Sequence, residues 1–195
     1  MKGWLLGCLL LAPLVVFAET WQQRLVDAAR EQTRHPVIYD GSYQRLDYPM
    51  GDVEPGRGVC TDVIIRAYRA LGVDLQQRVH EDMTAHFALY PKHWGLSRPD
   101  SNIDHRRVPN LQTYFRRFGE SLPVAPSGAS DYRPGDLLTW MLPGNLPHIG
   151  LVSDRRSADG KRPLIIHNIG AGTREEDALE VAPITGHYRL VPPES

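Results

Sequence analysis

Cysteine is scarce in this sequence, which has 195 residues and only two cysteines, Cys8 and Cys60. We expect the segment that contains Cys8 to be removed, so the mature chain has one thiol and cannot form an internal disulfide bond. Cysteines of exported proteins usually pair in oxidising compartments. A single unpaired thiol in such a protein therefore calls for a chemical explanation, which directs attention to Cys60.

A long uncharged hydrophobic run is present only at the N-terminus, where residues 3–18 follow Lys2 and precede Glu19. A run of this length, ending in the small residue Ala18, is typical of a secretory signal peptide and is too short for a membrane span. We therefore predict a signal peptide at residues 1–18, cleaved after Ala18. The mature protein is expected in the periplasm or outside the cell, without stable membrane insertion.

Neither sign of charge dominates, since 22 basic side chains stand against 23 acidic ones and the formal net charge is −1. This balance does not indicate the excess of basic side chains that binding to nucleic acid or anionic lipid requires. Internal repeats and low-complexity tracts are also absent. Residues 19–195 fit a single domain with a sizeable core, and we expect a monomer that needs no metal or other cofactor.

The residues after Gly58 predict an amphipathic helix that begins at Cys60 and ends near Gly72. Val63, Ala67 and Leu71 recur at helical spacing and give this helix one apolar face. Unpaired backbone N–H groups and the helix dipole at its N-terminus favour a thiolate, which is the nucleophilic form of cysteine. Cys60 is therefore a candidate nucleophile, although an inert buried thiol is the alternative.

The remaining elements predict an α+β fold in which helices pack on an antiparallel β-meander. Two further amphipathic helices are expected, and a loop rich in tyrosine, proline and glycine occupies residues 37–58 and leads into the Cys60 helix. Short apolar segments separated by turn residues predict strands. The expected helices are 20–33 and 110–118, and the expected strands are 137–141, 148–153 and 164–169, with one more strand between 179 and 190.

Two of the expected strands carry histidines suited to activate a cysteine. His148 lies in one of them and His167 in the next. His148 can act as the base for Cys60, and a neighbouring polar side chain can orient its ring by accepting the other N–H. Both His167 and the adjacent Asn168 have the chemistry for this role. Strand alternation alone does not decide between them.

A metal site is a competing interpretation of the segment between residues 80 and 105. This segment holds several side chains that could ligate a metal ion, but the HExxH pattern of zinc hydrolases is missing. The candidate ligands are His80, Asp82, His86, His93, Asp104 and His105.

The order of these motifs resembles that of the NlpC-type branch of papain-like cysteine peptidases. Cys60 begins a helix, Arg133-Pro134-Gly135-Asp136-Leu137 leads into a strand, and His148-Ile149-Gly150-Leu151-Val152 forms the next strand. Four stretches of the sequence are similar to the YijF-like family of uncharacterised exported bacterial proteins: the residues around Cys60 and residues 80–83, 102–110 and 167–170. The resemblance implies a papain-like fold, with Cys60 as nucleophile, His148 as base and His167 as the orienting residue.

The pattern also departs from the NlpC type in two respects. Val59-Cys60-Thr61 stands where those domains usually have Asp-Cys-Ser, and residues 73–130 make the interval between the cysteine and the histidine unusually long. Substrate specificity is therefore not inherited from the resemblance.

The leading hypothesis is an exported cysteine hydrolase that cleaves an amide bond, with peptidoglycan or a cell-wall peptide as substrate. Arg106 or Arg107 could grip a carboxylate of that substrate. The alternatives are a papain-like module that binds cell-wall fragments or a protein partner without catalysis, and a metal-dependent hydrolase. The side chains predicted to contact the substrate are Tyr43, Tyr48, Asp62, Asp104, His105, Arg106 and Arg107.

Overall fold

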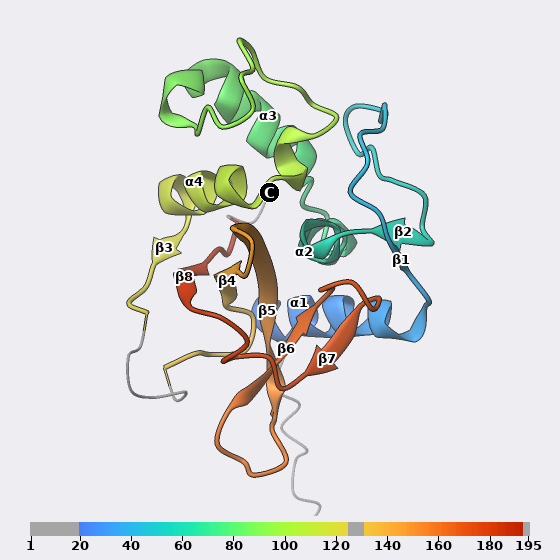
Figure 1. The fold of residues 1–195 in the computed structure, drawn as a ribbon, viewed down its shortest axis with the longest axis vertical. Coiled ribbons are helices and arrows are strands. Elements are labelled where there is room, and N and C mark those ends of the chain that lie inside the picture. Colours follow the sequence, from blue (N-terminus) through green and yellow to red (C-terminus); the bar gives the residue numbers. More distant parts are fainter. Residues whose placement is uncertain (1–19, 125–130, 193–195) are drawn as a thin grey trace, which may run out of the picture.

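The computed structural model describes residues 20–124 and 131–192. The predicted signal peptide, including Cys8, lies outside these residues. Within them the protein is α+β, with four α-helices and an antiparallel sheet of six strands (Figure 1).

The helices form in the first two thirds of the chain. Apolar residues on each helix supply one buried face. The α-helices are α1 (Trp21–Glu31), α2 (Cys60–Ala70), α3 (Leu75–His86) and α4 (Val108–Phe118), and the 3₁₀ helices are η1 (Gln32–Arg34), η2 (Phe87–Leu89) and η3 (Asp104–Arg106).

Two strand systems accompany the helices. A short parallel pair joins β1 (Ile38–Tyr39) to β2 (Arg57–Gly58), which directly precedes α2. The large sheet has the order β3-β8-β4-β5-β6-β7, so the last strand of the chain lies between two earlier ones. Its strands are β3 (Glu120–Ser121), β4 (Leu137–Leu142), β5 (Leu146–Arg156), β6 (Pro163–His167), β7 (Arg174–Glu176) and β8 (Ile184–Arg189).

The two faces of this sheet have different covers. Leu137, Ile149 and Ile166 belong to the larger core, which they form with apolar residues of all four α-helices. The alternate residues of the same strands, among them Trp140 and Ile165, pack with side chains from the connecting segments. The sheet is therefore buried on both faces, with helices on one and loops on the other.

Most of the predicted elements are confirmed. The helix at Cys60 ends as expected, since Gly72 has a φ of +80°, and Gly119 follows the last residue of α4. Helix α3 was missed, although Asp74 caps it by accepting a hydrogen bond from the Gln76 backbone. Strands β1 and β2 were predicted as loop, and β8 pairs with β4 instead of extending the meander.

No helix in the described ranges is long and apolar enough to cross a membrane.

Candidate active site

Cys60 is the first residue of α2 and is 4% exposed. Asp62 organises this helix start, because its carboxylate accepts a hydrogen bond of 2.6 Å from the Val59 backbone N–H. The same carboxylate receives two hydrogen bonds of 2.9 Å from the guanidinium of Arg106. A buried ion pair thus fixes the turn that presents the thiol.

Burial raises the pKa of the Cys60 thiol to about 11, and the negative charge of Asp62 adds to the rise. Backbone N–H groups of Ile149, Thr61 and Cys60 itself act in the opposite direction. The helix N-terminus was expected to favour the thiolate, but the loss of solvation outweighs that contribution. Cys60 is therefore a neutral thiol at neutral pH, and it needs a base to become a nucleophile.

A chain of hydrogen-bonded side chains crosses three neighbouring strands. Nε2 of His148 on β5 lies 2.7 Å from Nδ1 of His167 on β6, and Nε2 of His167 lies 3.0 Å from Oε1 of Glu176 on β7. A carboxylate can only accept, so Nε2 of His167 donates and its Nδ1 accepts from His148. The remaining nitrogen of His148, Nδ1, then carries a lone pair and is the basic atom of the chain.

Both histidines favour their neutral forms. Burial and, to a smaller extent, positive charge on His167 lower the pKa of His148 to about 3. Burial also lowers the pKa of His167, although Glu176 partly offsets this effect. Neutral imidazoles have one donor and one acceptor nitrogen each, which is the arrangement that the hydrogen-bonded chain requires.

The thiol and the histidine chain meet at the backbone of Ile149. This residue follows His148, and its N–H contacts the Cys60 sulfur. Among the described residues, no hydrogen bond joins Cys60 directly to His148. The backbones of the two residues are therefore close, and the contact between sulfur and imidazole stays a prediction, since catalytic hydrogen bonds are often long in unliganded enzymes.

Gly150 keeps the two histidines close. A Cβ atom at this position would lie 2.6 Å from Cγ2 of Ile165 and 3.1 Å from Cβ of His167. Any larger residue would push β6 away from β5 and lengthen the contact between the imidazoles.

The structure separates the two candidates for the third residue. His167 contacts His148, whereas Asn168 donates from Nδ2 to the carbonyl of Gly58 at 3.4 Å and accepts from the Gly170 backbone. Asn168 therefore ties the loop after β6 to the strand that precedes Cys60. In this arrangement His167 is the residue that orients His148.

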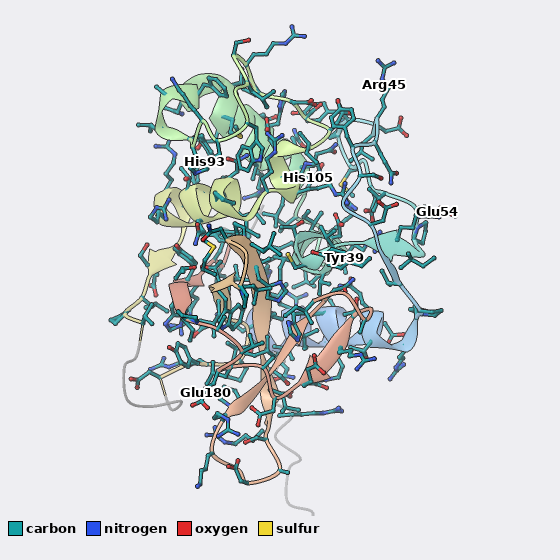
Figure 2. All side chains as sticks on the ribbon, in the orientation of Figure 1. Tyr39, Arg45, Glu54, His93, His105 and Glu180 are labelled. Carbon is teal, nitrogen blue, oxygen red and sulfur yellow. The ribbon has the colours of Figure 1, made fainter. Side chains whose placement is uncertain are left out.

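Tyr39 is a site residue that the sequence analysis did not select. It pairs with Gly58 across the β1–β2 ladder and lies close to the start of α2 (Figure 2). Burial raises the pKa of Tyr39 to about 12, and negative charge on Cys60 and Asp62 contributes to the rise. Its hydroxyl therefore stays protonated and can donate a hydrogen bond near the thiol. Nothing in the sequence distinguished it from the other tyrosines of the loop, Tyr43 and Tyr48.

Of the seven predicted substrate contacts, Asp62 and Arg106 lie beside Cys60. Arg106 is buried and also donates to the carbonyls of Asp40 and Ser42, so its side chain is held by contacts within the protein. It anchors the loop after β1 to the start of α2. Binding of a substrate by Arg106 stays a prediction. In the structure the contacts of this side chain hold two segments of the protein together.

The other predicted contacts lie apart from the thiol, on the α3 side of the molecule. The Tyr43 hydroxyl donates to Asp100, Tyr48 packs edge-on against His80, and Arg107 lies 4.0 Å over the Trp94 ring. Asp104 and His105 are buried in η3, and burial lowers the pKa of His105 to about 3. Within the described part of the chain, none of these side chains forms a hydrogen bond, ion pair or ring contact with Cys60, His148 or His167.

Two of the candidate metal ligands, Asp82 and His86, are engaged with other partners. Asp82 accepts hydrogen bonds from Arg117 and Tyr90, and it pairs with His86 at 3.0 Å. Across residues 20–124 and 131–192, no three His, Cys, Asp or Glu side chains are grouped so that they could hold a metal ion.

Comparisons with known proteins agree with the family that the sequence motifs indicated. The family described as a domain of unknown function, DUF1287, matches residues 26–190. The chain is also similar to the uncharacterized protein YijF of Escherichia coli (strain K12), with 54% identity over 165 residues, which cover 85% of this chain and 80% of that protein. The matched range contains Cys60, His148, His167 and Glu176.

Proposed function

The chain belongs to the DUF1287 domain family, and we propose that it is an exported cysteine hydrolase that cleaves an amide bond in cell-wall peptides. The single observation that carries the proposal is the chain from His148 through His167 to Glu176, because Ile149, the residue after His148, donates its backbone N–H to the sulfur of Cys60 at the start of α2. Nucleophile, base and orienting groups in this order are the elements of cysteine-dependent acyl transfer.

In the proposed reaction, Nδ1 of His148 takes the proton of the Cys60 thiol while the sulfur attacks the carbonyl carbon of the substrate. The negative charge that develops on the carbonyl oxygen is met by backbone N–H groups at the start of α2, with the Tyr39 hydroxyl as a further donor. His148 returns the proton to the leaving amine, which departs as the carbon–nitrogen bond breaks. Water, activated by His148, then hydrolyses the thioester and restores the thiol.

The choice of peptidoglycan as substrate follows the resemblance to NlpC-type peptidases. The papain-like assignment is supported by the order of helix and strands and by the position of the cysteine at the start of α2. The predicted signal peptide supports action in the periplasm or outside the cell.

Digestion of purified sacculi, followed by mass spectrometry of the released fragments, tests the proposal. The parent protein is expected to release peptide fragments with new amine and carboxyl ends, and the Cys60→Ala variant is expected to release none above background. Equal release by both proteins, or no release by either from sacculi and from the isolated peptides, would reject a cysteine hydrolase of the cell wall.

A further inference from the structure

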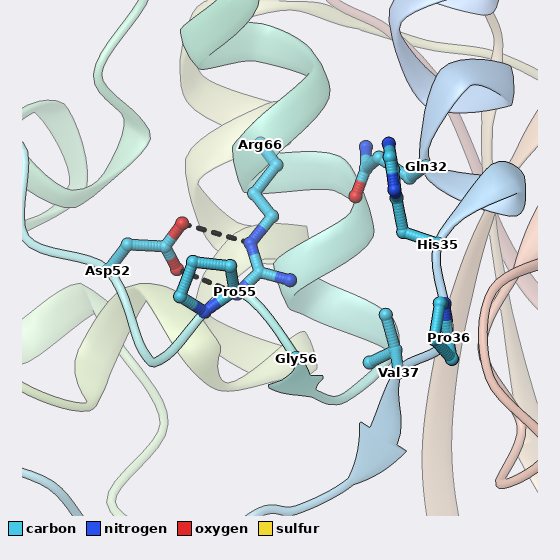
Figure 3. Close-up of a pocket in the computed structure, with 8 residues that line it drawn as sticks. All are labelled: Gln32, His35, Pro36, Val37, Asp52, Pro55, Gly56 and Arg66. Carbon is cyan, nitrogen blue, oxygen red and sulfur yellow. Dashed lines mark hydrogen bonds and ion pairs between the residues drawn. The ribbon is translucent and has the colours of Figure 1, made fainter.

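A cavity of about 460 Å³ lies between residues 32–37, the loop at residues 52–56 and Arg66 on α2 (Figure 3). Pro36, Val37 and Pro55 give it apolar walls, and Gln32 and Arg66 supply polar groups. The volume is in the range of small-molecule sites, and a few convergent polar groups on apolar walls are their usual composition. The reaction proposed for Cys60 does not use this cavity.

Arg66 has one nitrogen left for a ligand. Its Nε and Nη2 atoms bind Asp52 at 2.9 and 3.3 Å, and Nη2 also donates to the carbonyls of Val53 and Arg57. Within the described part of the chain, Nη1 has no hydrogen-bond partner. Figure 3 shows this nitrogen turned away from Asp52, toward the part of the cavity that Val37 borders.

The charge around Arg66 also favours an anion. Asp52 is shared, because Nη1 of Arg69 lies 3.0 Å from the carboxylate that Arg66 binds. The side chain of Arg66 is 17% exposed, so its bonds hold the guanidinium in place. A fixed guanidinium N–H with no internal acceptor is a preorganised donor for a carboxylate oxygen.

Gln32 supplies the complementary acceptor. Its Nε2 donates to the Val63 carbonyl at 2.9 Å, which fixes the amide, and its carbonyl oxygen is directed into the cavity (Figure 3). A ligand that fits both groups carries a carboxylate for Arg66, an N–H group for Gln32 and a small apolar part for the proline and valine walls. The end of a peptide has all three.

We propose that this cavity is a subsite that binds the carboxylate end of a peptide. Gly56 borders the cavity and lies four residues before Cys60 in the chain, just ahead of β2. Gly56 is therefore at most about 14 Å from Cys60, which is the span of four residues of fully extended chain. A Cβ atom added to Gly58 would lie 3.4 Å from Nη1 of Arg66. Strand β2, which contains Gly58, therefore borders both the cavity and the segment that leads to Cys60. The identification of the bound peptide as substrate rests on the proposed hydrolase function.

Gly56 allows the cavity to be blocked without removing any of these contacts. A Cβ atom at Gly56 has no heavy atom within 4 Å, so the backbone accepts a side chain. Gly56→Phe is expected to fill the cavity, and Gly56→Ala is the matched control that leaves most of it open. Both variants are made in the full chain carrying Cys60→Ala, so that binding is measured without turnover, and thermal unfolding checks that each is folded.

The probes are acetyl-alanyl-alanine and its C-terminal amide, titrated while the NMR signals of the Gly56 N–H and the Arg66 Nε–H are followed. The acid is expected to bind about tenfold more tightly than the amide, because only the acid gives the guanidinium a charged acceptor. Gly56→Phe is expected to lose the binding, and Gly56→Ala to keep it. Equal affinity for acid and amide, absence of binding, or unchanged binding in folded Gly56→Phe overturns the subsite.

The digestion of sacculi separates this inference from the proposed function. If the Cys60→Ala protein binds the acid but the parent releases no fragments, the cavity stands as a carboxylate site and its role as a substrate subsite is rejected. For the digestion, Gly56→Phe and Gly56→Ala are made in the parent chain with Cys60 intact. If the parent releases fragments and Gly56→Phe does so at the rate of Gly56→Ala, the subsite is rejected and the hydrolase stands.

Discussion

Nε2 of His167 lies 3.0 Å from Oε1 of Glu176, which places a carboxylate at the far end of the chain that begins at His148. The side chain of His167 is 2% exposed and that of Glu176 is 40% exposed, so the pair joins the buried site to the surface. An exposed carboxylate thus sets the tautomer of two buried imidazoles. This relationship gives the site four members where the sequence analysis named three.

Replacement of Glu176 tests its role as a positioning residue. Glu176→Leu removes the acceptor that holds the His167 tautomer and is expected to lower kcat about tenfold with little change in KM. Glu176→Gln keeps an accepting oxygen and is expected to retain most of the activity. Glu180→Gln, a change at an exposed glutamate nearby, is the control. Equal losses in the Leu and Gln variants would contradict the tautomer argument.

The proposed reaction predicts how losses divide among three residues. Cys60→Ala removes the nucleophile, and His148→Ala removes both the base and the acid of the reaction, so each is expected to reduce kcat by at least about 10²-fold. His167→Ala is expected to cost less, because an orienting group exchanges no reacting proton. Steady-state kinetics on a released peptide substrate measures these losses.

The double variant Cys60→Ala with His148→Ala provides the decisive comparison. Residues that act as a unit give losses that do not add in free energy, so the double variant is expected to be scarcely worse than either single one. Losses that multiply, or full turnover by Cys60→Ala, would exclude this catalytic unit.

Alkylation of Cys60 is expected to be slow at neutral pH. The pKa of this thiol is raised to about 11, so the thiolate fraction, and with it the rate of reaction with iodoacetamide, increases about tenfold per pH unit from pH 7 toward that value. A cysteine in an unfolded peptide, with a pKa of about 8.5, levels off earlier. Peptide mapping by mass spectrometry measures the rate at Cys60. A plateau already at pH 8 would mean that the thiolate is stabilised in the free protein.

The buried pair of Asp62 and Arg106 is expected to stabilise the fold. Arg106→Leu leaves the Asp62 carboxylate buried without its partner and is expected to lower the free energy of unfolding by about 3–5 kcal/mol. Arg107→Leu loses a stacking contact with Trp94 and is expected to cost about 1 kcal/mol. Urea unfolding measures both. An Arg106 variant with normal stability and a raised KM would support the sequence-based prediction of substrate binding instead.

Local patterns were sufficient for much of the fold and for part of the site. Helical spacing after Cys60 and the glycine at position 72 predicted α2, and apolar segments between turns predicted the strands of His148 and His167, but alternation left open whether His167 or Asn168 faces His148. Contacts between distant segments were not accessible in this way. Glu176 on β7 and Tyr39 on β1 reach the site only through strand pairings that no short-range pattern specifies.

Burial was the other quantity that the sequence did not reveal. Arg106 and Arg107 are adjacent and chemically identical, yet one is buried against Asp62 and the other stacks on Trp94. The same limitation applies to Cys60, because the helix start was predicted correctly while the loss of solvation that controls its pKa depends on the whole packed domain.

The position of β8 in the sheet constrains when the chain can fold. This strand lies between β3 and β4, and the hydroxyl of Tyr68 on α2 donates to the carbonyl of Leu190 just beyond it. The sheet and the packing around the cysteine helix are therefore incomplete until residues 184–190 are in place. Contacts of such long sequence separation form slowly, because the entropy of closing a long loop opposes them. A chain shortened before residue 184 would lose the strand that joins β3 to the rest of the sheet.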